Sequence, residues 1–170
     1  MSSGRGIEIL LETFSKIKEN LHLVFLGHGP LAKAIFKKTK EKNNIHMLQS
    51  VRSDQLQKYT SGADVGLSLI ENTCLNYFFS SPNKVFEYMS CGVIPIVSNF
   101  PVMNKIVREN NCGWSIDPNS KNLQKLLKKI TIKTIKQKRK NILQIRKKNC
   151  WEKEKTILLE NYKSIAKKCK

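Results

Sequence analysis

The sequence predicts an α/β fold with a mostly parallel sheet and helices on both faces, followed by a helical and very basic tail. Over residues 1–118, short apolar runs typical of buried strands alternate with longer segments in which apolar residues recur at helical spacing. This alternation is the pattern of βαβ units, which join parallel strands. After Asp117-Pro118 only helical stripes follow, and 170 residues suffice for one domain with an appendage. We therefore expect two units, residues 1–118 and residues 119–170.

The first half of the domain opens with an amphipathic helix, because Ile7, Leu10 and Phe14 recur on one helical face. The next apolar run is stopped by Gly27-His28-Gly29-Pro30, which indicates a strand and a tight turn. The expected elements are a helix over 6–19, a strand over 21–26, a helix over 30–42, a strand over 45–48 and a helix over 54–61.

The second half contains two further apolar runs, 64–70 and 93–97, which we interpret as buried strands. A polar stretch separates the first run from a helix that begins at Pro82 or Asn83. The expected elements are a strand over 64–70, a loop over 71–81, a helix over 83–91, a strand over 93–97, a helix over 102–109 and a strand over 113–116.

The net charge of +18 is concentrated in the tail. Residues 121–170 hold 18 Lys and Arg against 3 Glu, a net +15, which leaves +3 for residues 1–120. Such a charge first suggests nucleic acid or an anionic membrane surface as a partner. The tail also carries apolar stripes, among them Leu123, Leu126 and Ile130, so we expect it to pack on another surface. Nucleic acid is therefore the less favoured partner, behind a membrane surface or a general compositional bias toward Lys.

Composition also bears on the compartment. The chain has no apolar run near the ~20 residues of a membrane span, and we expect no signal peptide, because Glu8 and Glu12 interrupt the first apolar stretch. The five cysteines form no CxxC pair, and no His lies at metal-ligand spacing from one. We therefore expect a reduced, cytoplasmic protein without a disulfide framework or a zinc site.

The turns that follow the strands are the candidate binding loops, because open parallel sheets bind ligands at the carboxyl ends of their strands. Gly27 and Gly29 follow a strand and precede a helix, an arrangement that lets the backbone approach a phosphate. His28, between them, is a candidate hydrogen-bond donor to that phosphate. An ordinary tight turn accounts for the two glycines about equally well.

The stretch 81–89 is more informative. Pro82 or Asn83 begins a helix, and Lys84 in its first turn is unfavourable for the helix dipole unless an anion binds there. Glu87 lies one turn further on, where a carboxylate can accept hydrogen bonds from ribose hydroxyls. The alternative is an ordinary surface ion pair between Lys84 and Glu87. Arg5 is a second cation at a helix start, or else a solvated terminal residue.

The order of these motifs resembles the C-terminal half of group 1 glycosyltransferases, which are retaining enzymes of the GT-B fold that use nucleotide sugars. The resemblance spans essentially the whole chain, and the stretch 82–97 is its most specific part. It rests on Arg5-Gly6-Ile7, on residues 24–31, on Ala63-Asp64-Val65-Gly66-Leu67 and on residues 82–97.

The resemblance implies a Rossmann-like domain that binds the nucleotide-sugar donor. Glu87 would hold the ribose hydroxyls, and Arg5 takes the place of a Lys that contacts the donor diphosphate. The other implied contacts come from three turns or helix starts: Gly27, His28 and Gly29; Val51 and Arg52; and Pro82, Asn83 and Lys84. The first group would line the donor cleft, the second would flank the base, and the third would face the diphosphate.

The chain also departs from the family pattern. The family often carries a Glu near the transferred sugar, eight residues before Glu87, and this chain has Phe79 there. The family's first β-strand and its whole N-terminal, acceptor-binding half would precede Arg5, and we expect neither within residues 1–170. Either a separate N-terminal acceptor-binding chain supplies that half, or the chain is a fragment.

The leading hypothesis is the donor-binding domain of a hexosyltransferase that transfers a sugar from UDP or GDP to a glycan or a lipid-linked acceptor with retention. Catalytic residues are not identified, but Arg5 and Lys84 would stabilise the leaving diphosphate, so we expect no cofactor and no essential metal. The alternative is a non-catalytic subunit or truncated remnant that needs a separate acceptor-binding chain. A lipid-linked acceptor and the basic tail would favour a peripheral location on the inner face of the membrane.

Overall fold

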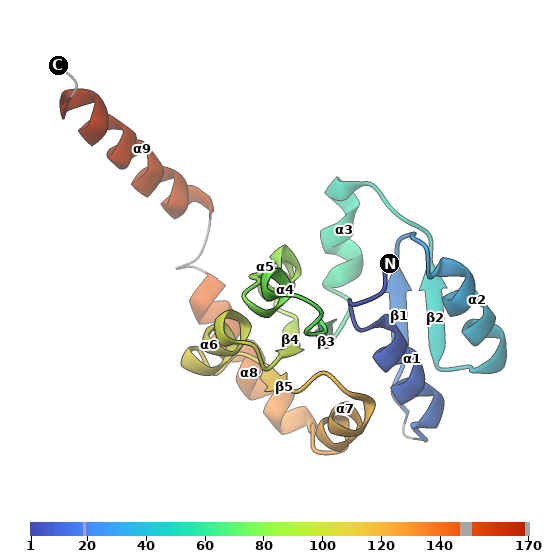
Figure 1. The fold of residues 1–170 in the computed structure, drawn as a ribbon. Coiled ribbons are helices and arrows are strands. Elements are labelled where there is room, and N and C mark those ends of the chain that lie inside the picture. The colour runs from blue at the N-terminus through green and yellow to red at the C-terminus, as the bar shows by residue number, and fades with distance from the viewer. Residues whose placement is uncertain (19, 147–150, 169–170) are drawn as a thin grey trace.

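The computed structural model, which describes residues 1–18, 20–146 and 151–168, forms parallel sheets flanked by helices (Figure 1). Its strands are β1 (Leu23–Leu26), β2 (Ile45–Leu48), β3 (Val65–Ser68), β4 (Ile94–Ser98) and β5 (Trp114–Ile116). Its helices are α1 (Ile7–Lys16), α2 (Ala32–Glu41), α3 (Ser53–Thr60), α4 (Leu75–Phe78), α5 (Asn83–Ser90), α6 (Pro101–Glu109), α7 (Ser120–Leu127), α8 (Ile132–Arg146) and α9 (Trp151–Lys168). The predicted α/β class and the helical C-terminal region are confirmed.

The strands form two parallel sheets where the sequence pattern suggested one. One sheet has the order β1-β2 and the other the order β3-β4-β5. Leu23 lies opposite Ile45 in the first sheet, and Val65 lies opposite Ile94 in the second. Within the described residues β1 and β3 are not paired, and Figure 1 shows them as separate neighbours.

Helix α1 connects the two sheets through one shared core. Its stripe of Ile7, Leu10 and Phe14 is buried in a cluster that contains Phe25 of β1 and Ile96 of β4. The helix begins against the end of β3: Gly6 has φ 75°, and a Cβ on it would lie 2.1 Å from the carbonyl oxygen of Leu69. Only glycine fits this approach, because a side chain would collide with backbone.

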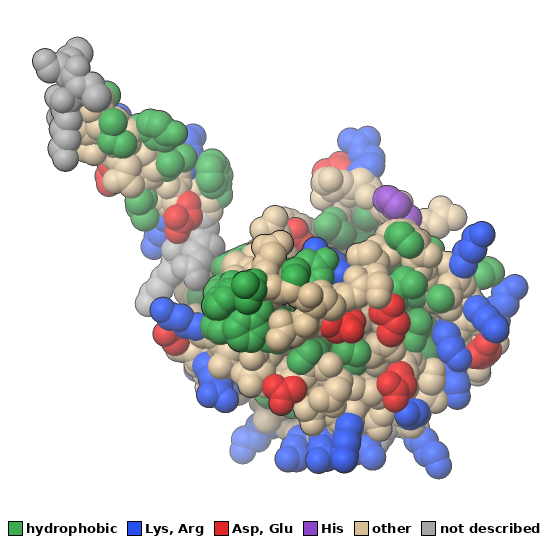
Figure 2. Space-filling model, viewed as in Figure 1, with side chains coloured by type: hydrophobic (Ala, Val, Ile, Leu, Met, Phe, Trp, Pro, Cys, Tyr) green, Lys and Arg blue, Asp and Glu red, His purple; other side chains and the backbone are tan. Residues whose placement is uncertain are grey.

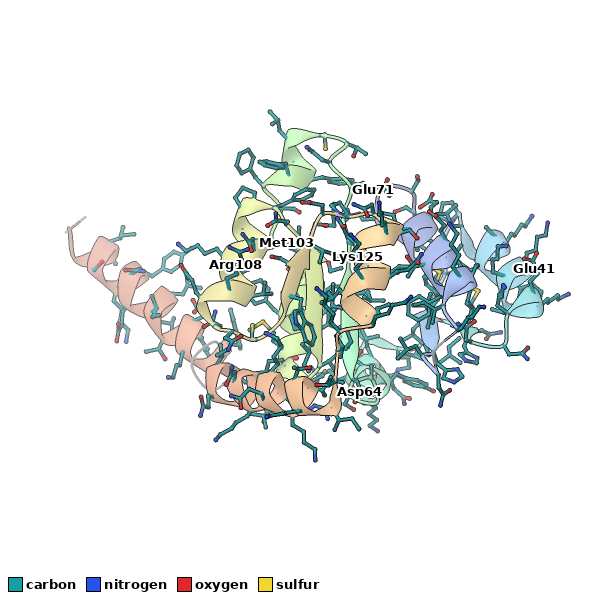
Figure 3. The ribbon with its side chains drawn as sticks, turned by 90° about the horizontal axis from the view of Figure 1, so that it is seen from below. Glu41, Asp64, Glu71, Met103, Arg108 and Lys125 are labelled. Carbon is teal, nitrogen blue, oxygen red and sulfur yellow. The ribbon has the colours of Figure 1, made fainter. Side chains whose placement is uncertain are left out.

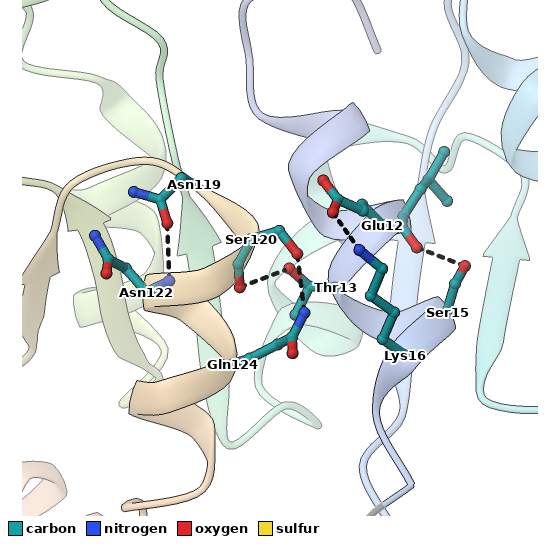
Figure 4. A network of polar contacts seen from close by, with 9 residues as sticks. Glu12, Thr13, Ser15, Lys16, Asn119, Ser120, Asn122 and Gln124 are labelled. Atoms are coloured by element: carbon teal, nitrogen blue, oxygen red, sulfur yellow. Dashed lines mark hydrogen bonds and ion pairs between the residues drawn. The ribbon is translucent and has the colours of Figure 1, made fainter.

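One polar contact joins α1 to α7, the first helix of the tail, and others hold α7 itself (Figure 4). The Thr13 hydroxyl donates to the Ser120 carbonyl oxygen at 3.5 Å, and the Gln124 amide donates to the Ser120 hydroxyl at 3.0 Å. Asn119 caps α7, because its side-chain oxygen accepts the N–H of Asn122 at 2.8 Å. The tail therefore begins as a packed part of the molecule.

Strand β4 is the central strand of its sheet, and all five of its residues are buried. It contains Pro95, a residue that central strands rarely tolerate because it lacks an N–H. The N–H of Asn99 donates to the Ile116 carbonyl oxygen at 2.8 Å, so the odd-numbered residues of β4 direct their N–H and C=O groups toward β5. The first β4 residue paired with β5 is Ile96, opposite Trp114, so Pro95 lies before that ladder begins.

The predicted loop over 71–81 was wrong at Leu75–Phe78, which form the short helix α4. Tertiary contacts hold this turn. Tyr77 lies under Arg5, whose guanidinium carbon is 4.7 Å from the ring centroid, and the Phe78 and Phe100 ring centroids are 5.1 Å apart. Sequence periodicity could not find a helix of this length, because one turn carries no period.

The tail divides into packed and exposed helices. Leu123 of α7 and Ile142 of α8 are fully buried, whereas Trp151 and Tyr162 of α9 are 66% and 65% exposed. Figure 1 shows α9 projecting from the body, and Figure 2 shows hydrophobic side chains along it. No described helix is both long and apolar enough to cross a membrane. The division at residue 118 stays a prediction, and residues 147–150 and 169–170 of the tail lie outside the described residues.

Gly66 of β3 provides a test of this packing. A Cβ on Gly66 would lie 2.4 Å from the Tyr88 ring, so Gly66→Ala should lower the free energy of unfolding by about 1–3 kcal/mol. The measurement is the urea midpoint and the thermal midpoint, which should fall by roughly 2–4 °C per kcal/mol. Gly62→Ala is the matched control, because its Cβ would meet its nearest atom at an ordinary 3.4 Å. Equal losses in the two variants would contradict the packing described.

Candidate functional site

The N-terminal segment lies across the carboxyl ends of β1 and β3. The amino group of Met1 donates to the His28 carbonyl oxygen at 2.8 Å, just after β1. The Glu71 N–H donates to the Gly4 carbonyl oxygen at 3.0 Å, just after β3. Residues 1–6 therefore bring Arg5, the turn after β1 and the loop after β3 to the same edge of the molecule, where parallel sheets bind ligands.

The glycine turn has the backbone conformation that glycine permits. Gly27 has φ 123° and Gly29 has φ 150°, and a Cβ on Gly29 would lie 2.4 Å from the backbone of Met1. The backbone that approaches Gly29 closely is therefore that of Met1. His28 is exposed. The contact of Gly27, His28 and Gly29 with a donor stays a prediction.

Arg5 is exposed at the start of α1, and its guanidinium stacks over the Tyr77 ring. Among the described residues no carboxylate lies within 4.0 Å of it. Stacking on an aromatic ring orients the guanidinium without neutralising it. Its charge is therefore available to an anion at this edge.

Helix α5 begins without a cap. Its N-cap residue is Pro82, no side chain accepts a hydrogen bond from its first turn, and that turn holds no acidic residue. Asn83 and Lys84 are exposed there. The unpaired N–H groups, the positive end of the helix dipole and the Lys84 ammonium together favour an anion.

The surface ion pair between Lys84 and Glu87 that the sequence left open does not form. Both side chains are exposed, and within the described part of the chain neither pairs with an opposite charge within 4.0 Å. Three residues apart, they share one face of α5, while Val85 and Met89 are buried on the other. The carboxylate and the ammonium are thus both available to a ligand.

Tyr88 anchors α5 to β3. Its hydroxyl donates to the Leu67 carbonyl oxygen at 3.2 Å. Burial first, and then the negative charge of Glu87, raise the pKa of Tyr88 to about 12, so the hydroxyl stays a neutral donor. With Val85 and Met89, this contact sets which face of α5 points outward, and so positions Lys84 and Glu87.

The loop after β2 lies next to the turn after β1, because the Gly27 N–H donates to the Leu48 carbonyl oxygen at 3.1 Å. Val51 is half-buried, and Arg52 is the exposed N-cap residue of α3. The Arg52 Nε lies 3.2 Å from an Asp54 carboxylate oxygen, so its charge has a partner. Among the described residues, no hydrogen bond or ion pair joins Arg52 or Glu87 to Arg5. The turn after β1, the loop after β2 and the segment that carries Arg5 thus lie at one edge of the molecule.

Glu71 is a residue that the sequence analysis did not single out. It follows β3 at the end opposite Asp64 (Figure 3), and its Oε1 is buried without a hydrogen-bond partner among the described residues. A buried carboxylate oxygen normally has a donor, from protein, water or ligand. The available signal was its place directly after an apolar strand, but nothing in the sequence predicts its burial.

Two hollows in the described part of the chain lie elsewhere. One, of about 290 Å³, lies at the carboxyl ends of β4 and β5, beside Asn99, Asp117 and Lys125. Figure 3 labels Lys125. The other, of about 340 Å³, lies at the opposite edge, where Arg139 pairs with Asp64 at 3.0 Å. None of the predicted site residues lines either hollow. Arg5, Lys84 and Glu87 are nevertheless exposed.

The chain matches a known protein family. The family described as glycosyl transferases group 1 matches residues 2–149. The chain belongs to the group 1 glycosyltransferases. This glycosyltransferase match covers Arg5, the glycine turn, Arg52 and the start of α5, and it ends before α9. No curated protein matches the chain. Family membership implies, in general terms, binding of a sugar donor and an acceptor.

The Tyr88 anchor has a pH signature. An unfolded tyrosine titrates near pH 10, so the stability that the raised pKa of Tyr88 contributes is complete below pH 10 and is lost as pH rises toward 12. Tyr88→Phe should lower the free energy of unfolding by about 1 kcal/mol at pH 7, because it removes the hydrogen bond to the Leu67 carbonyl oxygen. It should also remove a slope of up to about 1.4 kcal/mol per pH unit between pH 10 and 12, as measured by urea unfolding at each pH. The exposed Tyr59→Phe is the control, and wild-type-like alkaline slopes in both variants would contradict this assignment.

Proposed function

We propose that the chain is the donor-binding half of a retaining GT-B hexosyltransferase, and that a UDP- or GDP-sugar binds across the carboxyl ends of its strands. The single observation that carries the proposal is the start of α5. There an uncapped helix N-terminus, the unpaired ammonium of Lys84 and the unpaired carboxylate of Glu87 share one exposed face. The helix N-terminus and the ammonium suit a phosphate, and the carboxylate suits the hydroxyls of a ribose, so together they fit a ligand that contains both.

The donor is proposed to lie as follows. The diphosphate contacts Lys84, the first N–H groups of α5 and the guanidinium of Arg5, while Glu87 accepts hydrogen bonds from the ribose hydroxyls. The other contacts come from Gly27, His28 and Gly29 in the turn after β1, and from Val51 and Arg52 beside the base. Arg52 would have to exchange its Asp54 partner or use its backbone, because its side chain is engaged.

The proposed mechanism is electrostatic. When the bond between the sugar and the diphosphate breaks, negative charge grows on the leaving oxygen. Arg5, Lys84 and the α5 N–H groups stabilise that charge, so the protein's own cations do the work of a divalent metal and no essential metal is expected. Glu71 is a further proposed contact, because its Oε1 has no partner among the described residues and can accept a hydrogen bond from a hydroxyl of the transferred sugar. Phe79, which stands where the family often has a Glu, has no side-chain oxygen for this role.

A second candidate function is a non-catalytic subunit that needs a separate acceptor-binding chain. The observation that favours it is exposed apolar surface on α9, where Trp151, Ile157 and Tyr162 are all more than half exposed. This helix is proposed to contact the acceptor-binding chain, with the basic tail beside an anionic membrane surface on the cytoplasmic side. Each Lys or Arg near such a surface is worth about 1 kcal/mol.

Nucleotide binding tests the donor site. Isothermal titration with UDP and with GDP should give saturable binding of one of them by the wild-type chain. Glu87→Ala and Lys84→Ala should each raise Kd by about tenfold to a hundredfold, because each removes charge-assisted hydrogen bonds worth about 1.5–3 kcal/mol.

Lys121→Ala is the matched control for Lys84→Ala. Lys121 also lies in the first turn of a helix, but that helix, α7, is already capped by Asn119. Binding by this variant should equal that of the wild type. A folded wild-type chain that binds neither UDP nor GDP would overturn the proposed function, and a Glu87→Ala variant with wild-type affinity would overturn the ribose assignment.

A turnover assay distinguishes a chain that is active alone from a non-catalytic subunit. Incubation of the chain with radiolabelled UDP-glucose or GDP-mannose, with and without a lysate fraction that supplies acceptors, should release UDP or GDP if the chain is active alone. We expect release only when a second polypeptide is present, because Arg5, Lys84 and Glu87 are exposed and another surface would have to cover them to exclude water. Full turnover by the purified chain would refute the subunit function.

A further inference from the structure

The hollow of about 290 Å³ at the carboxyl ends of β4 and β5 has the lining of a binding site of its own. Its walls come from the ends of these two strands and from one side of α7, three segments that are separate in the sequence. None of the proposed donor contacts lines it. We call it the α7 hollow.

Two lysines border the α7 hollow. Lys125 lies in the last turn of α7, and Lys129 follows the residue that ends this helix. Both are exposed, and within the described residues no carboxylate lies within 4.0 Å of either ammonium group. The C-terminal end of a helix favours lysines by itself, so their charges alone do not define a ligand. Together with the polar groups of the same hollow, they do.

Three polar side chains line the hollow beside these lysines, those of Asn99, Asp117 and Asn122. The Asn99 amide donates to the Asp117 carboxylate at 3.4 Å, and the Asn122 amide donates to the Asp117 carbonyl oxygen at 3.5 Å. These bonds are long and therefore weak. They leave the oxygens of both amides unused among the described residues. A sugar hydroxyl both donates and accepts, so clustered amide and carboxylate groups suit a ring with several hydroxyls.

Apolar side chains complete the lining. Ile116 of β5 and Leu126 of α7 border the hollow, and both are partly buried against the core cluster that contains the apolar face of α1. The C–H groups of a sugar ring can pack on such a surface while its hydroxyls reach the polar groups around it. The volume is close to the lower end of ligand pockets, roughly 300 Å³, and suits a ligand the size of one sugar ring.

The charge of the lining selects the kind of anion. Two ammonium groups stand against one carboxylate, so a ligand with a single negative charge balances the hollow. A phosphate monoester carries roughly −1.5 to −2 at pH 7 and would repel Asp117 more strongly. We propose that the α7 hollow binds a uronic acid residue, a sugar ring with one carboxylate. Lys125 and Lys129 contact that carboxylate, and the hydroxyls bond to Asn99, Asp117 and Asn122.

The position of the hollow relates this ligand to the acceptor. The Ser98 hydroxyl donates to the Ile70 carbonyl oxygen at 2.6 Å, and Glu71 is the next residue along the chain. The hollow and the proposed sugar contact of Glu71 therefore lie at the same edge of one sheet. A uronic acid unit of the acceptor glycan is the ligand that this edge would meet. Only the assignment to the acceptor rests on the proposed function, because binding of the uronic acid itself needs the hollow alone.

Methyl β-D-glucuronide is the probe, added to the full chain at pH 7 and followed by heteronuclear NMR. The side-chain amides of Asn99 and Asn122 should shift in a saturable way, because the ligand bonds to them directly. The backbone amides of α5, which lies outside the hollow, should not shift.

Lysine variants test the contact with the carboxylate. Lys125→Gln and Lys129→Gln should each raise Kd by about two- to fivefold, the effect expected when an exposed charge pair is lost. Lys121→Gln is the matched control, because Lys121 lies in the first turn of the same helix and outside the hollow. This variant should bind like the wild type. Unchanged thermal midpoints in all three variants would show that they remain folded.

Three further ligands decide what the hollow recognises. Methyl β-D-glucoside, which lacks the carboxylate, should bind several-fold more weakly, and so should inorganic phosphate and glucose 6-phosphate. Equal or tighter binding of any of these three, or no saturable shift with the glucuronide, would overturn the inference. A separate titration with UDP and GDP reports on the donor site. Glucuronide binding by a chain that binds neither nucleotide would overturn the proposed function and support the α7 hollow.

Discussion

The burial of one face of α1 is the interaction on which the rest of the structure depends. Among the described residues no strand of one sheet pairs with a strand of the other, so the sheets are joined by side-chain packing and by the backbone contacts of residues 1–6. Ile7, Leu10 and Phe14 supply that packing, and the start of the helix is possible only because Gly6 lets it approach Leu69. At about 1.5–3 kcal/mol for each fully buried large side chain, this face is a substantial part of the net stability of a domain.

Because α1 fixes β1 against β3, the turns that follow both strands come to one edge. The geometry of α5 then decides what that edge can bind. Val85 and Met89 are buried and Tyr88 is bonded to β3, so the remaining face of the helix, with Lys84 and Glu87, points outward. The charges that define the candidate site are therefore consequences of apolar packing on the opposite side of the same helix.

The basic tail has a different meaning once its helices are placed. Helices α7 and α8 bury Leu123 and Ile142 in the two core clusters, so much of the charge lies on the outer faces of structural helices. Such faces are expected to be solvated and lysine-rich without any polyanionic partner. Helix α9 leaves Trp151, Ile157 and Tyr162 more than half exposed, and for that reason it, more than the charge, indicates a surface that meets something else.

The sequence by itself determined the kinds of element and their order, because helical and strand periods are local properties that short windows of residues carry. It also determined the motif from Pro82 to Glu87, whose chemistry follows from residue type and spacing. The tertiary structure alone decided the break between β1 and β3, the burial of the Glu71 carboxylate, the α4 turn under Arg5 and the absence of a Lys84–Glu87 ion pair. Each of these depends on which distant segments meet, and no local period encodes that.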